Sequence, residues 1–253
     1  MIIDSFDNKT KVKINPNLDG NRVKCNACII TFSNILEEYI LKKYNPEIIG
    51  YIKTVNGSIP IYIVNYNNKI IAIYKTILGA PASVSCLEDS LEIIETNKYI
   101  AFGGSGCLNK EIARGKIMVP TEAYRDEGTS YHYVEPSDYI KIKNADIVAK
   151  YMDNQKIPYV LGKTWTTDAF FRETEGNMEK RKKEGCISVE MECSALQAVC
   201  DYRNIELYYF FSSGDLLDSP KWDTRIVDKN DYRGTQHDSR LIDIAIELAD
   251  FIS

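Results

Sequence analysis

Two carboxylates stand where a strand-like apolar segment passes into a helix-like one. Residues 187–196 read Ile-Ser-Val-Glu-Met-Glu-Cys-Ser-Ala-Leu, and the acids are Glu190 and Glu192. Burying a carboxylate costs free energy unless it is paired or used, and strand-to-helix junctions are where open α/β sheets bind ligands. Alternatively, the two acids lie in the first turn of a helix, where the helix dipole stabilises negative charge. The spacing alone leaves both interpretations open.

A second candidate site is the glycine-rich segment Gly103-Gly104-Ser105-Gly106, which follows the apolar run 99–102. Its unobstructed backbone N–H groups and one hydroxyl could hold an anion. The segment fits neither the dinucleotide-binding nor the P-loop fingerprint. A glycine-rich turn without further role is the alternative.

A third acid, Asp215, ends the segment 212–215 directly after the aromatic, apolar run 207–211. Loss of solvent there would favour a protonated carboxyl that can donate a proton, although an Asx-turn or helix cap is the alternative. Phe170 and Phe171 interrupt a polar segment, where they could stack on a flat ligand or anchor a loop in the core.

The elements that must position these residues alternate between short apolar runs and helical patterns. The β-branched and aromatic runs predict strands at residues 27–32, 48–55, 59–64, 70–77, 99–102, 116–120, 157–161, 187–190 and 207–211. Helical periodicity predicts helices at residues 34–40, 82–95, 145–155 and 173–184, from about 193, and around 241–248. Residues 164–171 are expected to form a loop.

Asn56-Gly57 and Asn67-Asn68 separate three of the strands and favour an antiparallel meander, because these residues tolerate a positive φ. The predicted fold is therefore α/β, a three-layer α/β/α sandwich around a mixed central sheet. We expect one domain over residues 1–253, with residues 1–24 as an irregular N-terminal arm.

Composition excludes several classes of function. The net charge is −5 and the longest cationic cluster, residues 180–183, is flanked by acids, so nucleic acid is not an expected partner. No apolar run is long enough to span a bilayer and the N-terminus lacks a signal-peptide pattern, so we expect a cytoplasmic protein without a membrane partner. Seven cysteines, most of them in apolar segments, suit reduced thiols, and with only two histidines we expect no metal site.

Five segments, taken in order, resemble the nucleoside phosphorylase family that includes purine nucleoside phosphorylase, uridine phosphorylase and methylthioadenosine nucleosidase. The segments are residues 103–106, 124–133, 166–170, 189–192 and 214–215, and the resemblance runs from about residue 79 to residue 215. It implies a phosphorylase-like domain that needs no metal or organic cofactor and uses phosphate as co-substrate. It also implies a homo-oligomer, either a dimer or a trimer of dimers.

On the sugar side, the resemblance implies four substrate-binding residues. Glu192 matches the acid that grips the ribose 2′ and 3′ hydroxyls, and Met191 matches the side chain that packs on the sugar. Val189 and Glu190 match residues beside the base and the sugar. A carboxylate at this place would stabilise the positive charge that develops on the sugar when its bond to the base breaks.

For the base and the phosphate, the resemblance implies roles for four more residues. Phe170 matches the aromatic side chain that stacks on the base, and Asp215 matches the catalytic acid that protonates the departing purine. Gly104 and Ser105 lie in the segment that holds phosphate in phosphorylases. Phosphate or water then needs only to be held beneath C1′ of the sugar.

Two departures from the family pattern bear on the nucleophile and the base. Residue 101 is alanine where phosphorylases usually carry arginine, and residues 32–36 lack the second expected arginine, so either Arg125 or Arg172 substitutes or water attacks. Residues 174–176 lack the Gln-x-Arg pair that reads uracil, whereas residues 125–132 look like the uridine branch. Purine or pyrimidine specificity is therefore open.

The sequence thus predicts a pentosyltransferase that cleaves the N-glycosidic bond of a ribo- or deoxyribonucleoside with phosphate, giving free base and pentose 1-phosphate. One alternative is a nucleosidase that uses water as the nucleophile. A second is a nucleoside-binding protein that has lost catalysis, an interpretation favoured by the missing arginines and opposed by the presence of Glu192 and Asp215.

Overall fold

Most of the strands pair into one mixed sheet in the computed structural model of the chain, which describes residues 1–225 and 235–253. The sheet contains β2 (Ala27–Thr31), β3 (Glu47–Thr54), β4 (Gly57–Tyr66), β5 (Lys69–Lys75), β7 (Lys98–Cys107), β8 (Ile117–Asp126), β9 (Tyr139–Lys141), β10 (Tyr159–Thr167), β11 (Cys186–Glu190) and β12 (Glu206–Leu216). The two short strands β1 (Val23–Lys24) and β6 (Ile94–Glu95) pair separately.

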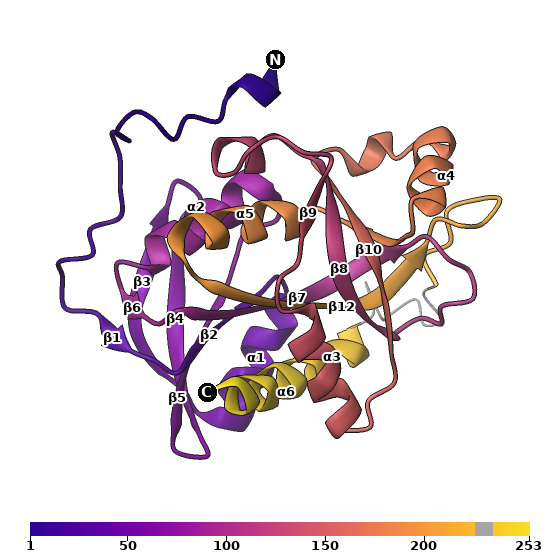
Figure 1. Ribbon diagram of the computed structural model, residues 1–253. Coiled ribbons are helices and arrows are strands. Elements are labelled where there is room, and N and C mark those ends of the chain that lie inside the picture. Colours follow the sequence, from indigo (N-terminus) through magenta and orange to yellow (C-terminus); the bar gives the residue numbers. More distant parts are fainter. Residues whose placement is uncertain (226–234) are drawn as a thin grey trace.

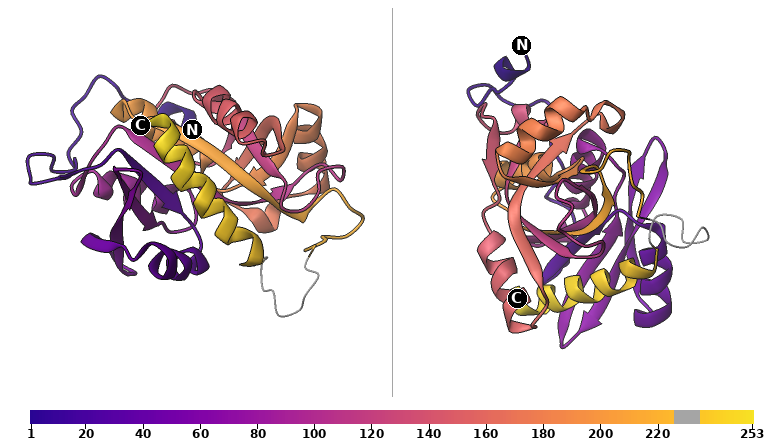
Figure 2. Two further views of the ribbon diagram at one scale, coloured as in Figure 1. Left: turned by 90° about the horizontal axis from the view of Figure 1, so that it is seen from below. Right: turned by 90° about the vertical axis from the view of Figure 1, so that its right-hand side faces the viewer.

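Helices cover both faces of this sheet (Figure 1). They are α1 (Asn34–Tyr44), α2 (Ala80–Ser90), α3 (Ala145–Asn154), α4 (Glu175–Lys183), α5 (Cys193–Arg203) and α6 (Thr235–Ile252), with short 3-10 turns η1 (Ile2–Asp4), η2 (Ser130–His132) and η3 (Phe170–Arg172). One apolar core lies between the sheet and α2 with α5, and a second lies between the sheet and α3 with α6. Figure 2 shows α6 crossing the second face. The predicted three-layer sandwich around a mixed sheet is confirmed.

The predicted meander is also confirmed, because β3 pairs antiparallel with β4 and β4 with β5. Asn67 and Asn68, which join β4 to β5, have φ values of 47° and 62°. Such values suit a tight hairpin whose twist matches that of its strands. The β2 strand then lies parallel to both β5 and β7, buried along its whole length as its apolar sequence predicts.

Several strands run further than the sequence pattern predicts. The β7 strand continues through the glycine-rich segment to Cys107, β12 continues through Asp215, and β10 includes residues 164–167, which we expected in a loop. The extra length is paired: Gly104 faces Ser212 on β12, and Thr166 faces Glu190 on β11. Pairing with neighbouring strands therefore overrides the low strand propensity of glycine here.

The long strands also bend until the sheet meets itself. The end of β11 pairs antiparallel with the end of β7, where Val189 faces Gly106. Because β7, β12, β8, β10 and β11 are paired in succession, this contact closes a ring of strands. A β-carbon on Gly106 would lie 2.8 Å from Cγ1 of Val189, so only glycine permits this close approach.

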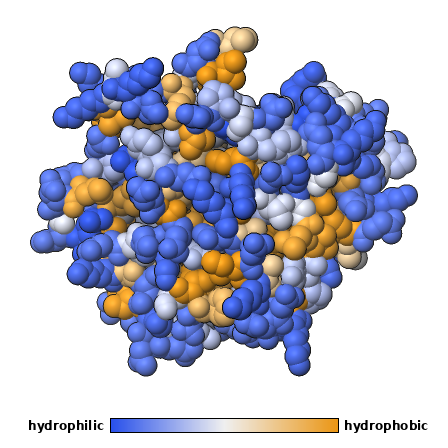
Figure 3. All heavy atoms as spheres, in the orientation of Figure 1, coloured by the Kyte–Doolittle hydropathy of each residue, from blue (hydrophilic) through white to orange (hydrophobic). Residues whose placement is uncertain are grey.

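The face of the protein that Figure 3 draws is mostly polar. Figure 3 shows apolar side chains in separate patches between polar ones on the face that it draws. Among the described helices, none is both long and apolar enough to cross a membrane. The seven cysteines are all free thiols, and six of them are buried, as the sequence predicts for reduced thiols in apolar segments.

Candidate active site

Glu190 lies at the end of β11 and is held by four hydrogen bonds. One carboxylate oxygen accepts the hydroxyls of Thr166 at 2.6 Å and Thr164 at 3.4 Å. The other accepts the backbone N–H groups of Glu192 at 2.8 Å and Cys193 at 2.7 Å, which begin α5. An ionised carboxylate has about four acceptor positions, so these contacts use them all.

Burial raises the pKa of Glu190 to about 7, although its hydrogen bonds act in the opposite direction. Through its hydrogen bonds to the N–H groups of Glu192 and Cys193, the side chain anchors the N-terminus of α5, as the helix-dipole interpretation requires. Thr166 extends this network, because its hydroxyl also accepts the backbone N–H of Ser194 at 3.1 Å. Whether Glu190 contacts a substrate stays a prediction.

Glu192 is buried beside Glu190 but has fewer donors. Its carboxylate accepts the backbone N–H of Gly79 at 2.6 Å, and a backbone hydrogen bond from Met191 also lowers its pKa. Gly79 precedes α2 with a φ of 97°, a conformation that L-residues rarely adopt. Burial first and the charge of Glu190 second raise the pKa of Glu192 to about 8. This acid thus retains acceptor capacity that the described residues do not use up.

The glycine-rich segment lies beside these acids, through the pairing of Val189 with Gly106. Ser105 is buried, and its hydroxyl has no hydrogen-bond partner among the described residues. Gly104 is exposed, and a β-carbon built on it would meet no atom within 4 Å. The segment thus offers one open backbone position and one unused hydroxyl side by side on β7.

Asp215 and Phe170 lie at the ends of two other strands. Asp215, near the end of β12, is half-buried and accepts the indole N–H of Trp222 at 2.6 Å. Phe170 begins η3, just after β10, and its ring lies 4.0 Å from that of Phe171. Phe170 is 48% exposed, so it is available to a ligand and does not anchor the core.

Asp168 links these strand ends to the acids. It lies between β10 and Phe170, and its charge contributes to the raised pKa of Glu192. Its carboxylate accepts the backbone N–H of Gly128 at 3.0 Å, which ties the residue 124–133 segment to the same region. Residues from all five segments that carry the resemblance therefore lie on adjoining strands or on the turns that follow them.

Arg125, one of the two arginines considered as phosphate ligands, is buried. Its Nε and Nη1 are engaged elsewhere, and its Nη2 has no hydrogen-bond partner among the described residues. Its Nε donates to the hydroxyl of Ser130 at 2.8 Å and its Nη1 to the carbonyl of Glu135 at 2.7 Å, while the guanidinium lies 4.1 Å from the ring centre of Tyr131. These contacts organise the segment that contains η2. Arg172, the other candidate, is exposed on η3.

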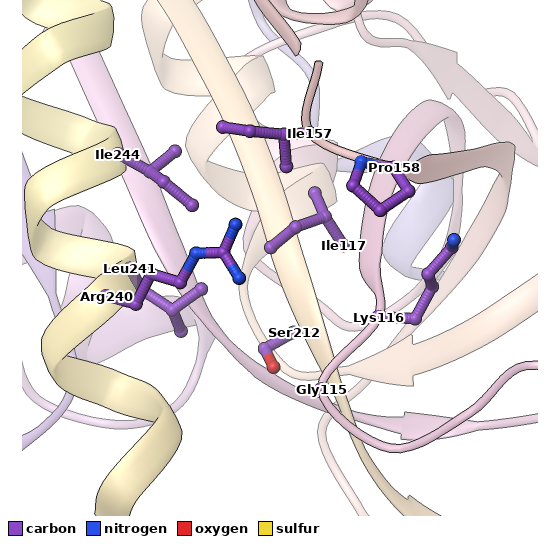
Figure 4. A pocket seen from close by; sticks show the side chains of 9 residues that line it. All are labelled: Gly115, Lys116, Ile117, Ile157, Pro158, Ser212, Arg240, Leu241 and Ile244. Carbon is purple, nitrogen blue, oxygen red and sulfur yellow. The ribbon is translucent and has the colours of Figure 1, made fainter. Parts of the chain in front are cut away.

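A small pocket lies apart from these residues, between the start of β8 and helix α6 (Figure 4). Arg240 of α6 lies over Ser212 and Ile117 in it. Its volume is about 100 Å³, whereas sites for small organic ligands are typically about 300 Å³ or more. None of the substrate-binding or catalytic residues predicted from the sequence lines it.

Comparison with known proteins decides the family. A family model described as the phosphorylase superfamily matches residues 27–247. The chain belongs to the phosphorylase superfamily. The matched span includes every strand of the large sheet and each of the site residues described above.

Several individual relatives of this superfamily member can be named. It is 26% identical to uncharacterized protein R802 of Acanthamoeba polyphaga mimivirus, over 60% of each chain. It is 25% identical to the 5′-methylthioadenosine/S-adenosylhomocysteine nucleosidase of Buchnera aphidicola, over 67% of this chain and 77% of that protein. It is also 25% identical to the uridine phosphorylase of Haemophilus influenzae, over 53% of this chain and 59% of that protein.

The chain thus spans about 60% of the length of the mimivirus protein and of the uridine phosphorylase. Among solved structures, purine nucleoside phosphorylase from Toxoplasma gondii in complex with immucillin-H superposes with a TM-score of 0.72. The match covers 95% of this chain and 96% of that one at 16% sequence identity. At this identity the likeness shows a shared fold.

Some residues of this candidate site were not predicted from the sequence. Thr166 lies in one of the segments that carry the resemblance, but the sequence predicts no role for it. In the structure its hydroxyl positions Glu190. Glu127 accepts the hydroxyl of Ser194 at 2.9 Å and so secures the first turn of α5. Trp222 contacts Asp215, but it lies in a polar segment without any periodic pattern.

Proposed function

We propose that this member of the phosphorylase superfamily cleaves the N-glycosidic bond of a nucleoside and releases the free base. The observation that carries the proposal is the difference between its two buried acids. Glu190 has all its acceptor positions filled by the protein. Within the described part of the chain, the carboxylate of Glu192 has no donors beyond the backbone of Gly79 and Met191. Two adjacent ribose hydroxyls are donors of the kind that would complete the hydrogen bonding of Glu192.

The other site residues suit the two charges that develop in this reaction. Breaking the bond from C1′ to the base nitrogen leaves positive charge on the sugar, which a carboxylate in a dry site stabilises strongly. Negative charge develops on the base, and Asp215 is the acid that would supply a proton there. Phe170, exposed at the start of η3, offers a ring face on which the base can stack.

Phosphate is the first candidate nucleophile, so that the products would be the base and a pentose 1-phosphate. The open backbone at Gly104 and the hydroxyl of Ser105, which has no partner among the described residues, support an anion site on β7. Water is the second candidate. It is favoured by the neutral residue Ala101, fully buried where an arginine was expected, because a dianion without a positive partner is costly to desolvate.

The deciding experiment measures release of base from a panel of purine and pyrimidine nucleosides, with and without inorganic phosphate. Phosphorolysis requires phosphate and yields pentose 1-phosphate, whereas hydrolysis proceeds at the same rate without phosphate and yields free pentose. The Asp215→Asn variant should lose at least about 10²-fold in kcat with either nucleophile. Nucleoside binding measured by calorimetry without release of any base would refute an enzyme and leave a binding protein.

A further inference from the structure

Trp222 is an exposed tryptophan that the mechanism proposed above does not use. Its side chain is 71% exposed, whereas Trp165, the other tryptophan of the chain, is buried. An indole carries one polar group, the ring N–H, and this group can only donate a hydrogen bond. In Trp222 it donates to Oδ2 of Asp215 at 2.6 Å. The one polar group of this side chain therefore bonds to the acid that is proposed to protonate the base.

The turn that carries Trp222 is held at two places. Leu216 and Asp223 close it as an isolated antiparallel pair, with N–H···O distances of 2.7 and 3.1 Å. Within the turn, Asp218 forms a 2.7 Å ion pair with Lys182 of α4. Because the turn is anchored both to the end of β12 and to α4, it holds the indole beside the carboxyl group that it contacts.

The hydrogen bond makes the two oxygens of Asp215 unequal. Oδ2 accepts the indole N–H, whereas Oδ1 receives no hydrogen bond from the described residues. In a neutral carboxyl group, one oxygen carries the proton and the carbonyl oxygen is the better acceptor. A donor fixed at Oδ2 therefore favours the form in which Oδ1 carries the proton and can present it to a ligand.

The same hydrogen bond gains strength when Asp215 gives up its proton. Before the transfer the indole N–H faces a neutral carboxyl group, and after the transfer it faces a carboxylate. Hydrogen bonds to an ionised acceptor are roughly twice as strong as those between neutral groups. An interaction that strengthens toward the transition state lowers the barrier, whereas one of constant strength does not. The contact is therefore suited to proton donation from Oδ1.

We propose that Trp222 is a positioning residue that directs the acid proton of Asp215 to Oδ1 and stabilises the carboxylate that remains when this proton reaches the base. The inference rests on the proposed function and deepens it. As the C1′–N bond breaks, its electron pair goes to the base, and the base takes up the proton from Oδ1. The electron pair of the O–H bond stays on Asp215. An oxygen of phosphate or water bonds to C1′, and a proton from this nucleophile or from solvent restores the acid.

The first test compares a nucleoside with 4-nitrophenyl β-D-ribofuranoside, whose leaving group departs as a stable anion and needs no proton. Trp222→Phe keeps an aromatic ring but removes the donor, so kcat for the nucleoside should fall about tenfold, with KM changed less than about threefold. The kcat for the nitrophenyl riboside should stay within about twofold of the wild-type value. Trp222→His, which retains a ring N–H, should recover part of the loss. The matched control is Lys221→Gln, at the exposed neighbour of Trp222 in the same turn. Equal losses on both substrates, or no loss on the nucleoside, overturn the proposal.

A double-mutant cycle tests whether Trp222 acts through Asp215. Once Asp215→Asn has removed the acid, Trp222→Phe should cause no further loss of kcat for the nucleoside. A further loss of about tenfold in that background would show that the two side chains act independently, and it would overturn the proposal.

The last test needs no turnover. The chain has two tryptophans, so nitrogen-15 NMR should show two indole N–H signals, and the one absent from Trp222→Phe belongs to Trp222. In folded Asp215→Ala protein, which lacks the acceptor, this signal should move upfield and exchange faster with solvent, while the signal of Trp165 stays in place. An unchanged Trp222 signal overturns the contact even when the enzyme is active. If the signal responds but the wild type cleaves neither substrate, the contact is supported and the proposed function fails.

Discussion

Replacing Glu192 by Gln should lower activity and, at alkaline pH, raise stability. The side chain is 4% exposed, and burial and Glu190 raise its pKa to about 8, against 4.5 for a free glutamate. Since the folded protein binds this proton more tightly than the unfolded chain does, ionisation of Glu192 destabilises the fold. The penalty is absent below about pH 4.5, grows as the pH rises and is complete above pH 8.

The size of the effect follows from that difference in pKa. At about 1.4 kcal/mol per pH unit, the full difference corresponds to about 5 kcal/mol. Glu190 titrates in the same range and shares the cost, so we expect about 2–3 kcal/mol from Glu192 alone. Glutamine keeps an oxygen for the N–H of Gly79 and carries no charge. Thermal unfolding of Glu192→Gln at pH 9 should therefore occur about 5–10 °C above that of the wild type.

Activity should change in the opposite direction. Hydrogen bonds from two ribose hydroxyls to a charged acceptor contribute about 1.5–3 kcal/mol each, so kcat/KM for nucleoside cleavage should fall by about 10²-fold or more. Calorimetric scans at pH 5 and pH 9, together with rates at pH 7, test both expectations. The control is Glu175→Gln, at an exposed acid in the first turn of α4. Lower stability of the variant at pH 9 would refute the assignment of a buried, costly charge. Unchanged kcat/KM would refute the ribose contact.

Three further predictions concern Glu192 and residues near it on β10 and β7. At pH 7, nucleoside binding should release a proton from Glu192, seen as a dependence of the calorimetric enthalpy on the buffer, and absence of this dependence would contradict a ribose contact. Thr166→Val removes the 2.6 Å hydrogen bond to Glu190 and should lower the free energy of unfolding by about 2 kcal/mol in urea titration, whereas no loss would show that the bond is dispensable. Gly106→Ala places a β-carbon 2.8 Å from Val189 and should cost about 1–3 kcal/mol in the same assay, which full wild-type stability would contradict.

The sequence predicted most of the sheet because its central strands are continuous apolar runs. Residues 27–32 and 207–211 can only be buried on both faces, and the pair Asn67-Asn68 fixes a hairpin by its tolerance of positive φ. The far ends of β7 and β12 could not be predicted in this way. Glycines and serines there have weak strand propensity, and they are extended only because neighbouring strands pair with them.

The sequence predicts the residues of the candidate site but not the contacts between them. The resemblance names Glu192 and Asp215, yet it does not indicate that Thr166 saturates Glu190, because that contact joins residues 24 apart in the sequence. Trp222 reaches Asp215 through a turn that is closed where Leu216 pairs with Asp223. Periodicity describes single elements, so pairs of side chains from different elements lie beyond it.

The helix-start interpretation applies to Glu190, and the ligand-binding interpretation stays a prediction for Glu192. Glu190 is the acid at the helix start: four donors offset its burial, and it holds the first turn of α5. The cost of burying Glu192 is less fully offset by donors, and the charge of Glu190 raises its pKa further. A hydrogen bond from a ligand to this buried carboxylate is therefore stronger than the same bond in water. A fold that keeps such an incompletely satisfied carboxylate gives up stability at that position. A diol that supplies two donors at once would recover that stability, and this is the role that we propose for Glu192.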